Sequence, residues 1–229
     1  MSLTLEKFIA LEDIQSDKEF IYNSYSINFL DSFQTTGKRV FDLFISIMFF
    51  FLVAWWLFLL ISIFILIDSR GPIIFRQLRH GKNNRPFYCY KFRTMRYNPG
   101  DEFEQARRND SRITRVGKFL RRTSMDELPQ IINILLGEMS VVGPRPHALP
   151  MNREYSNQIS KFMYRHYVKP GVTGLAQCKG FRGEIKDERD IRFRLKYDLF
   201  YIKKWSVSFD IYIAFLTAKC IIFDNKNAY

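Results

Sequence analysis

The longest hydrophobic pattern in the chain is a run of 25 residues, Leu43 to Ile67, without a charged residue, a glycine or a proline. Only Ser46 and Ser62 interrupt its apolar character. As an α-helix it would be about 37 Å long, which is more than the hydrocarbon core of a bilayer at about 30 Å. The pattern therefore predicts a membrane helix rather than a buried helix of a soluble protein or a signal peptide.

The charges at the two ends of this helix leave two topologies open. Lys38 and Arg39 precede it, and the chain from Ser69 onward carries 31 basic and 15 acidic residues. The positive-inside rule then places both ends on the cytoplasmic side, which requires a re-entrant helix instead of a single span. However, a bend within the membrane normally needs a proline or another helix breaker, and residues 43–67 contain none.

After Asp68 the pattern changes to short β-rich runs and amphipathic segments, which predicts an α+β fold. The β-rich runs 72–79 and 87–95 flank a turn and predict a β-hairpin. We expect loops at the Gly- and Pro-rich segments 142–146 and 169–174. Helices are expected at residues 101–108, 114–121, 124–136, 147–166, 187–203 and 206–223. The last of these helices is expected to be interfacial or packed on the membrane helix.

Length and charge divide the chain into three parts. Its 229 residues suffice for one globular domain with appendages. We expect an N-terminal extension (1–37), an anchor helix (38–68) and a compact domain (69–229). The net charge is +12, although residues 1–42 alone carry a net charge of −3. The basic domain therefore predicts anionic partners such as phosphates, nucleic acid or lipid headgroups.

Cysteines and histidines predict no metal or disulfide site. Cys89, Cys178 and Cys220 are odd in number and far apart, so we expect free thiols in a reducing compartment. The three histidines are scattered without the spacing of metal ligands.

Two adjacent carboxylates, Asp126 and Glu127, stand in the stretch TSMDELPQ. One interpretation is structural, because Ser124 followed three residues later by Glu127 matches a capping box. Pro129 would then suit the first position of a helix rather than its interior. In either case the pair lies at a helix start, where we expect the helix dipole to keep Asp126 ionised and available as a nucleophile.

Basic residues near this pair favour a chemical role. Arg121 precedes it, Arg145 lies in the stiff segment GPRP, and Lys91 and Arg93 belong to the predicted hairpin. A carboxylate that attacks a pyrophosphate is repelled by its negative charges. Such a site therefore needs guanidinium groups on the phosphoryl oxygens, and usually a divalent metal held by a second carboxylate. The sequence contains all of these protein groups.

Longer motifs connect the pair to a known family. The chain contains KFRTM, DSRITRVGKFLRRTSMDELPQIINILLGEMSVVGPRP, KPGVTGLAQCKGFRGE and YDLFYIKKWSVSFDIYIAFLT. These segments resemble the bacterial sugar transferase family, the small monotopic phosphoglycosyl transferases. The resemblance runs from Lys38 to the C-terminus. GFRGE and the closing KNAY are similar to its undecaprenyl-phosphate glucose phosphotransferase branch.

The resemblance implies a reaction and its residues. A UDP-sugar would give its sugar 1-phosphate to undecaprenyl phosphate with release of UMP, as the first membrane step of exopolysaccharide or other surface glycan synthesis. Glucose is the expected sugar, and galactose or an N-acetylated sugar is the alternative. Asp126 would form a covalent phosphosugar intermediate, and Glu127 would help to bind Mg²⁺. The implied phosphate-binding residues are Arg121, Arg145, Lys91 and Arg93.

The resemblance also implies a location. The catalytic domain would face the cytoplasm at the inner membrane of a bacterium. Membrane lipid would be a partner and nucleic acid would not, and the resemblance does not specify the oligomeric state. The anchor in this family is a re-entrant helix usually broken by a proline near its middle, which is missing here in the stretch AWWLFL, residues 54–59. A different hypothesis, a non-catalytic adaptor whose basic surface binds anionic lipid or nucleic acid, explains the charge and the anchor but not the clustered carboxylates.

Overall fold

The computed structural model describes residues 32–97, 110–181, 183, 185 and 187–223. The expected helix at 101–108 and most of the expected N-terminal extension lie outside these residues. The described helices are α3 (Ser32–Phe49), η1 (Phe50–Ala54), α4 (Trp55–Asp68), η2 (Lys82–Asn84), α5 (Arg115–Thr123), η3 (Met125–Glu127), α6 (Gln130–Leu136), α7 (Leu149–Gln158), η4 (Phe162–Tyr167), α8 (Leu175–Cys178), α9 (Glu188–Lys204) and α10 (Val207–Phe223). The strands are β1 (Ile74–His80), β2 (Pro86–Phe92), β3 (Ser140–Val142) and β4 (Gly171–Thr173).

The fold combines helices with short strands, as expected for an α+β protein, and begins with one long apolar helix. Within the described residues, Thr35–Asp68 is long and apolar enough to cross a membrane, with a mean hydropathy of 2.9. Only 17% of its most apolar window is buried against the rest of the protein. Its exposed apolar face therefore needs another cover, for which a membrane is suited.

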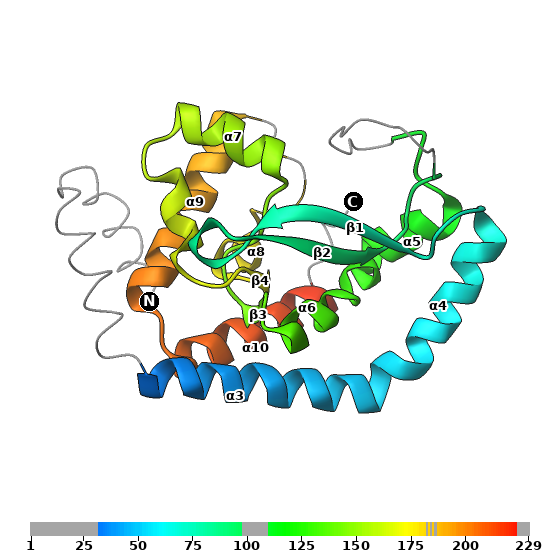
Figure 1. Ribbon diagram of the computed structural model, residues 1–229, viewed down its shortest axis with the longest axis horizontal. Helices are drawn as coiled ribbons and strands as arrows, with labels where there is room; N and C mark the ends of the chain where they lie inside the picture. The colour runs from blue at the N-terminus through cyan, green and yellow to red at the C-terminus, as the bar shows by residue number, and fades with distance from the viewer. Residues whose placement is uncertain (1–31, 98–109, 182, 184, 186, 224–229) are drawn as a thin grey trace.

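This helix bends without a proline. Figure 1 shows α3 and α4 running in different directions, and the five-residue π-helix η1 lies between them. A π-helical turn inserts an extra residue into the helical hydrogen-bond pattern, which is a recognised cause of kinks. Near this turn the indole Nε1 of Trp56 donates to the carbonyl of Leu52 at 3.2 Å. The bend is therefore produced by a π-helical turn and not by a helix-breaking residue such as proline.

The N-terminal end of α3 is joined to the globular part by buried polar contacts. Lys38 Nζ donates to Asp210 Oδ2 of α10 at 2.5 Å and to the Val142 carbonyl at 3.0 Å. Asp42 Oδ1 accepts from Ser140 Oγ at 2.8 Å and from the Val141 amide at 2.9 Å. These bonds fix the start of the apolar helix on β3 and α10.

The C-terminal end of α4 packs on the same globular part. Ile61 and Ile65 form a buried cluster with Phe92 of β2 and Leu120 of α5. Asp68 Oδ2 accepts from the amide of Val116 at 2.8 Å, which satisfies a free N–H in the first turn of α5. Both ends of the bent helix therefore contact one globular unit.

The strands form two small sheets. β1 pairs with β2 in antiparallel register, with Ile74 opposite Phe92 and His80 opposite Pro86. β3 pairs with β4 in parallel. Residues 143–146 form a loop as expected, whereas β4 lies within the segment 169–174 that was expected to be a loop. The strands were missed because each is only three residues long and lies next to Gly and Pro.

Helix predictions are confirmed where no break intervenes. The ranges 114–121, 187–203 and 206–223 match α5, α9 and α10 within two residues. The range 124–136 instead splits into η3 and α6 at Pro129, and 147–166 splits into α7 and η4 near Lys161, whose φ is 62°. The last helix, α10, contacts α3 and α8, as expected for a helix packed on the anchor. The three cysteines are free, as expected.

We predict that Asp210→Ala destabilises the protein strongly. Asp210 is fully buried and accepts hydrogen bonds from Lys38, Tyr201 and Trp205, so its loss leaves a buried ammonium without its counter-ion. A cost of about 3 kcal/mol corresponds to a thermal midpoint lower by roughly 6 to 12 °C. Circular dichroism in detergent micelles measures the midpoint. Glu188→Gln, which breaks an exposed ion pair with Arg192, should leave it nearly unchanged.

Candidate active site

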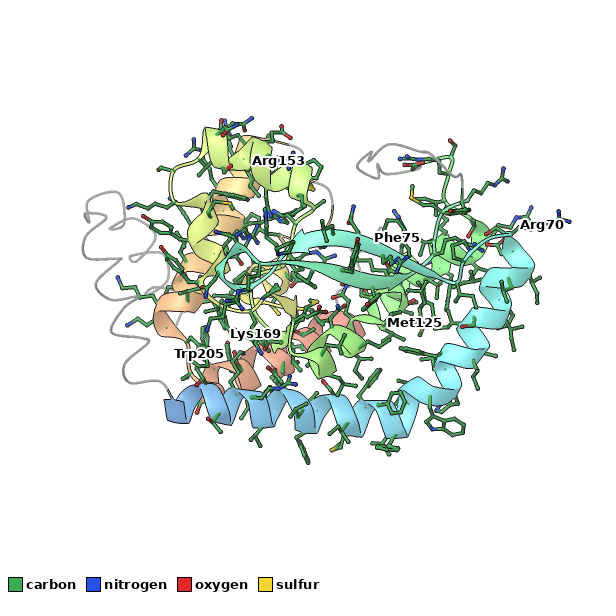
Figure 2. The ribbon with its side chains drawn as sticks, in the orientation of Figure 1. Arg70, Phe75, Met125, Arg153, Lys169 and Trp205 are labelled. Atoms are coloured by element: carbon green, nitrogen blue, oxygen red, sulfur yellow. The ribbon has the colours of Figure 1, made fainter. Side chains whose placement is uncertain are left out.

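The two carboxylates lie in a short link between α5 and α6. α5 ends at Ser124, which adopts a left-handed conformation with a φ of 61°, and η3 follows at once. Met125, labelled in Figure 2, opens this turn next to β2 and α4. Glu127 is buried and Asp126 is partly buried. The turn thus presents two adjacent carboxylates with different surroundings.

The capping-box interpretation is wrong. The Ser124 side chain makes no capping hydrogen bond to η3, because the left-handed Ser124 ends one helix rather than beginning a regular one. The Glu127 carboxylate does not turn back to Ser124 but bonds two cations. Charge-assisted hydrogen bonds are stronger than a bond to a neutral amide, so the ion pairs decide where this side chain points.

Glu127 is held by one lysine and one arginine. Lys91 Nζ of β2 donates to Oε1 at 2.7 Å. Arg145 approaches as a fork, with Nη1 donating to Oε2 at 3.0 Å and Nη2 donating to Oε1. Burial opposes the ionised form of Glu127, but Arg145 and Lys91 outweigh it and hold the pKa well below its ordinary value. Glu127 is therefore the member of the pair whose ionised form the site favours.

Asp126 has the opposite character. Among the described residues, no hydrogen bond or ion pair to its carboxylate is present. Burial raises its pKa and Glu127 adds to this effect, while Lys91, Arg121 and Arg145 lower it. The expectation that a helix dipole keeps Asp126 ionised left out this burial, because the carboxylate lies in a separate 3-10 turn before α6 and loses solvent there. The two carboxylates have pKa values pushed apart, which is typical of pairs with divided roles.

Arg121 reaches the pair from the last turn of α5. Its Nε donates to Thr94 Oγ1 at 2.8 Å, and its charge lowers the pKa of Asp126. This position depends on Gly117, because a Cβ there would lie 2.7 Å from the carbonyl carbon of Thr94. Only glycine lets α5 come so close to the segment after β2, and this contact sets where Arg121 stands.

The loop that carries Arg145 is clamped by other arginines. Arg165 Nη2 donates to the carbonyl of Arg145 at 2.8 Å and to Asp198 Oδ2 at 2.6 Å, and its Nη1 donates to His147 Nδ1 at 2.7 Å. Burial and the charge of Arg165 hold the pKa of His147 well below its usual value, so the neutral ring can accept this bond. The backbone and the next side chains of the loop are thus fixed before any substrate arrives.

Arg79 is a cation of the site that sequence reasoning missed. Its Nη1 donates to the carbonyl of Pro146, and its charge acts on Arg145, Glu127 and Asp126. Within the described residues, its buried Nε has no hydrogen-bond partner. Sixty-seven residues separate Arg79 from Pro146, so no local pattern could have linked them. Its place in β1, beside the strand with Lys91, is the only signal that pointed to it.

The structure brings Lys91, Arg121 and Arg145 to the carboxylate pair but not Arg93. Arg93 is buried and donates to the carbonyl of Ser69 at 2.5 Å, at the end of α4. Lys91 and Arg93 would share one face of a continuous strand, but β2 ends at Phe92. Arg93 therefore ties the anchor helix to the sheet, and this geometry lends no support to its expected phosphate contact.

The carboxylate pair fits Mg²⁺ only together with a substrate. Within the described ranges, no group of three His, Cys, Asp or Glu side chains could hold a metal ion. Mg²⁺ commonly binds through one or two carboxylates, several waters and substrate phosphates. Glu127 Oε2 accepts one bond from Arg145 and keeps a second lone pair. Oxygen donors therefore exist, although a phosphate-bearing ligand must complete the coordination.

Comparison with known proteins extends these observations. Residues 33–224 match the model of the family described as bacterial sugar transferase. A protein of Xanthomonas campestris pv. campestris, named UDP-glucose:undecaprenyl-phosphate glucose-1-phosphate transferase, is 52% identical over 76% of this chain and 36% of its own length. Exopolysaccharide production protein PSS of Rhizobium leguminosarum bv. phaseoli is 44% identical over 79% of this chain and 92% of its own length.

A further relative carries a different sugar in its name. UDP-N-acetylgalactosamine-undecaprenyl-phosphate N-acetylgalactosaminephosphotransferase of Aeromonas hydrophila is 41% identical over 70% of this chain and 38% of its own length. The chain therefore spans little more than a third of the Xanthomonas and Aeromonas proteins, and nearly all of the Rhizobium protein.

We predict that Glu127 contributes to acid sensitivity. Its pKa in the folded protein lies well below the ordinary value of 4.5. Below about pH 4.5, Glu127 therefore becomes protonated in the unfolded chain while it is still ionised in the folded protein. Its stabilising contribution is present above pH 4.5 and is lost as the pH falls toward the folded pKa. Thermal midpoints measured from pH 7 to pH 3.5 should fall less steeply for Glu127→Gln than for the wild type. Parallel curves would contradict the ion-pair arrangement.

Proposed function

This chain belongs to the bacterial sugar transferase family, and on that premise we propose that it transfers a sugar 1-phosphate from a UDP-sugar to undecaprenyl phosphate. The product would be a membrane-bound diphosphate sugar, the first lipid-linked intermediate of an exopolysaccharide or another surface glycan. The observation that carries the proposal is the pair Asp126 and Glu127, in which one carboxylate is clamped by cations and its neighbour has no bond within the described residues.

The reaction has two displacements at one phosphorus atom. First, an oxygen of Asp126 attacks the phosphorus that bears the sugar, and the bond from this phosphorus to the bridging oxygen breaks. UMP leaves with the electron pair, and the sugar phosphate remains on Asp126 as an acyl phosphate. Second, an oxygen of undecaprenyl phosphate attacks the same phosphorus, and the bond between this phosphorus and the Asp126 oxygen breaks. Asp126 regains its carboxylate, and the sugar diphosphate remains on the lipid.

Cations on both sides of the pair support this sequence. An anionic nucleophile and a diphosphate repel each other, so the approach requires positive groups that are already in place. Arg121 comes from α5, Arg145 comes from the clamped loop, and Lys91 comes from β2. Arg79 adds a fourth positive charge within range of Asp126.

We propose Mg²⁺ as the cofactor, with Glu127 as its protein ligand. When bound with the substrate, the ion would neutralise charge on the diphosphate and on the departing UMP. Glu127 can serve it while Lys91 and Arg145 keep its side chain in one orientation. As sugar we propose glucose, because the relative named for UDP-glucose is 52% identical and the relative named for N-acetylgalactosamine 41% identical.

We predict that Asp126→Asn lowers turnover about a thousandfold or more, because it removes the nucleophile. UMP release should be measured with purified protein, Mg²⁺, undecaprenyl phosphate and a panel of UDP-sugars. Without the lipid acceptor, mass spectrometry should find one sugar phosphate attached to the wild type and none attached to Asp126→Asn. Glu188→Gln is the control on an exposed carboxylate of α9. Near-normal turnover of Asp126→Asn would rule out the covalent step.

For the anchor we propose a re-entrant helix, with the globular domain on the cytoplasmic side of the inner membrane. Lys38 and Asp42 at one end and Ile65 and Asp68 at the other all contact the same globular unit. A span would have to carry one of these ends through the bilayer and away from its partners. The bend at η1 permits the helix to enter the bilayer and to return to the same face.

Labelling of single cysteines should test this topology. In a variant that lacks the native cysteines, we predict that cysteines placed at Ser2 and at the exposed Arg70 both resist a membrane-impermeant maleimide in intact spheroplasts. Both should react after lysis, because re-entry leaves both flanks of the helix in the cytoplasm. Reaction at Ser2 before lysis would instead establish a spanning helix.

A further inference from the structure

Lys169, a lysine near the N-terminal part of α3, has no hydrogen-bond or ion-pair partner among the described residues. Lys169 lies just before β4 and is partly buried (Figure 2), and no hydrogen bond or ion pair to its ammonium group is present in the part of the chain that the structure describes. A Cβ added to Gly137 would lie 3.6 Å from Lys169 Nζ and 3.8 Å from Arg39 Nη2. The two cationic groups therefore face the same point, next to the C-terminal end of α6.

The charges around Lys169 are mostly positive. Burial lowers the pKa of Lys169, and so do the charges of Arg39, Lys82 and Lys38, while Asp42 raises it. The two Nη groups of Arg39 donate to the carbonyls of Ile134 and Leu135, at 2.6 and 2.8 Å, and no ion pair of Arg39 with a carboxylate is present among the described residues. Lys38 is paired with Asp210. In the described part of the chain, the pair Lys169 and Arg39 thus has no carboxylate partner.

The position of this pair identifies the kind of anion. Arg39 is followed directly by Val40, which is 61% exposed and begins the apolar face of α3. If that face enters the bilayer, Arg39 and Lys169 stand at the level where lipid headgroups begin. The carboxylate pair precedes the N-terminal end of α6, whereas Arg39 caps its C-terminal end. The two positions are therefore separate.

We propose that Lys169 and Arg39 form a binding site for the phosphate of an anionic phospholipid headgroup, such as phosphatidylglycerol. The proposal rests on the membrane placement proposed above. A headgroup phosphate would accept a hydrogen bond from Lys169 Nζ and lie close to the positive charge of the Arg39 guanidinium. The acyl chains of the same lipid would follow the exposed apolar side of α3. Basic residues at this level attract anionic lipids, and the attraction falls off within a Debye length.

Such a lipid would act on the anchor rather than on the chemistry. Arg39 bonds the end of α6, and Lys38 and Asp42 bond β3 and α10, so this corner joins the apolar helix to three elements of the domain. A headgroup bound here sets the depth at which the N-terminal end of α3 enters the bilayer.

Native mass spectrometry of the full-length protein, released from micelles with equal amounts of phosphatidylglycerol and phosphatidylcholine, tests the site. We expect Lys169→Gln to retain about fivefold less phosphatidylglycerol than the wild type and an unchanged amount of phosphatidylcholine. Lys169→Arg should retain the wild-type amount. Arg153→Gln removes one positive charge on α7, on the opposite side of the domain from α3 (Figure 2), and should also leave retention unchanged.

The outcomes separate the two proposals. Equal phosphatidylglycerol retention by the wild type and Lys169→Gln overturns the lipid site but leaves the membrane placement standing. Retention of neither phospholipid by the wild type overturns the placement and the lipid site with it. A parallel sample with inorganic phosphate alone identifies the source of the anion, since Lys169-dependent phosphate adducts without a preference for phosphatidylglycerol also overturn the site.

Discussion

The ion pairs of the buried Glu127 carboxylate are the interactions on which the rest of the site depends. A charge without water is tolerated only when cations replace the lost solvation, and Lys91 and Arg145 do this from β2 and from the loop after β3. The three elements are therefore held in one arrangement by the same group. Asp126 gains its character from this arrangement, because its neighbour already takes the hydrogen bonds of two cations. The result is one fixed charge beside a carboxylate that has no hydrogen bond or ion pair among the described residues.

A second constraint comes from the apolar helix, whose exposed face has to be covered and whose two ends are both held. Lys38 is bonded at the start of the helix, and Asp68 is bonded at its end. The π-helical turn η1 reconciles these demands, since it changes the direction of the helix without a proline. The candidate active site therefore lies on a domain whose position relative to the apolar helix is fixed at two points. For the proposed transfer of a sugar phosphate from a soluble nucleotide sugar to a lipid phosphate, this fixed relation is suitable.

Local patterns predicted much of the fold. The apolar run became α3, η1 and α4, and the ranges of α5, α9 and α10 were close, because each depends on its own periodicity. Sequence reasoning failed at β3 and β4, which are three residues long and are stabilised by their pairing with each other. It also failed at the bend, because a π-helical turn has no fixed residue signature. Of the site, Lys91, Arg121 and Arg145 were predicted and are near the carboxylate pair, whereas Arg93 was predicted and lies at the end of α4.

The sequence by itself determined that this chain has an apolar helix before a basic α+β domain, and that Asp126 and Glu127 stand among arginines. These features are local, since they depend on residues that are neighbours along the chain. Only the tertiary structure decided which of the two carboxylates is clamped by Lys91 and Arg145, and that Arg79 joins the site. Those outcomes depend on burial and on contacts between residues far apart in the sequence, and both exist only once the chain has packed.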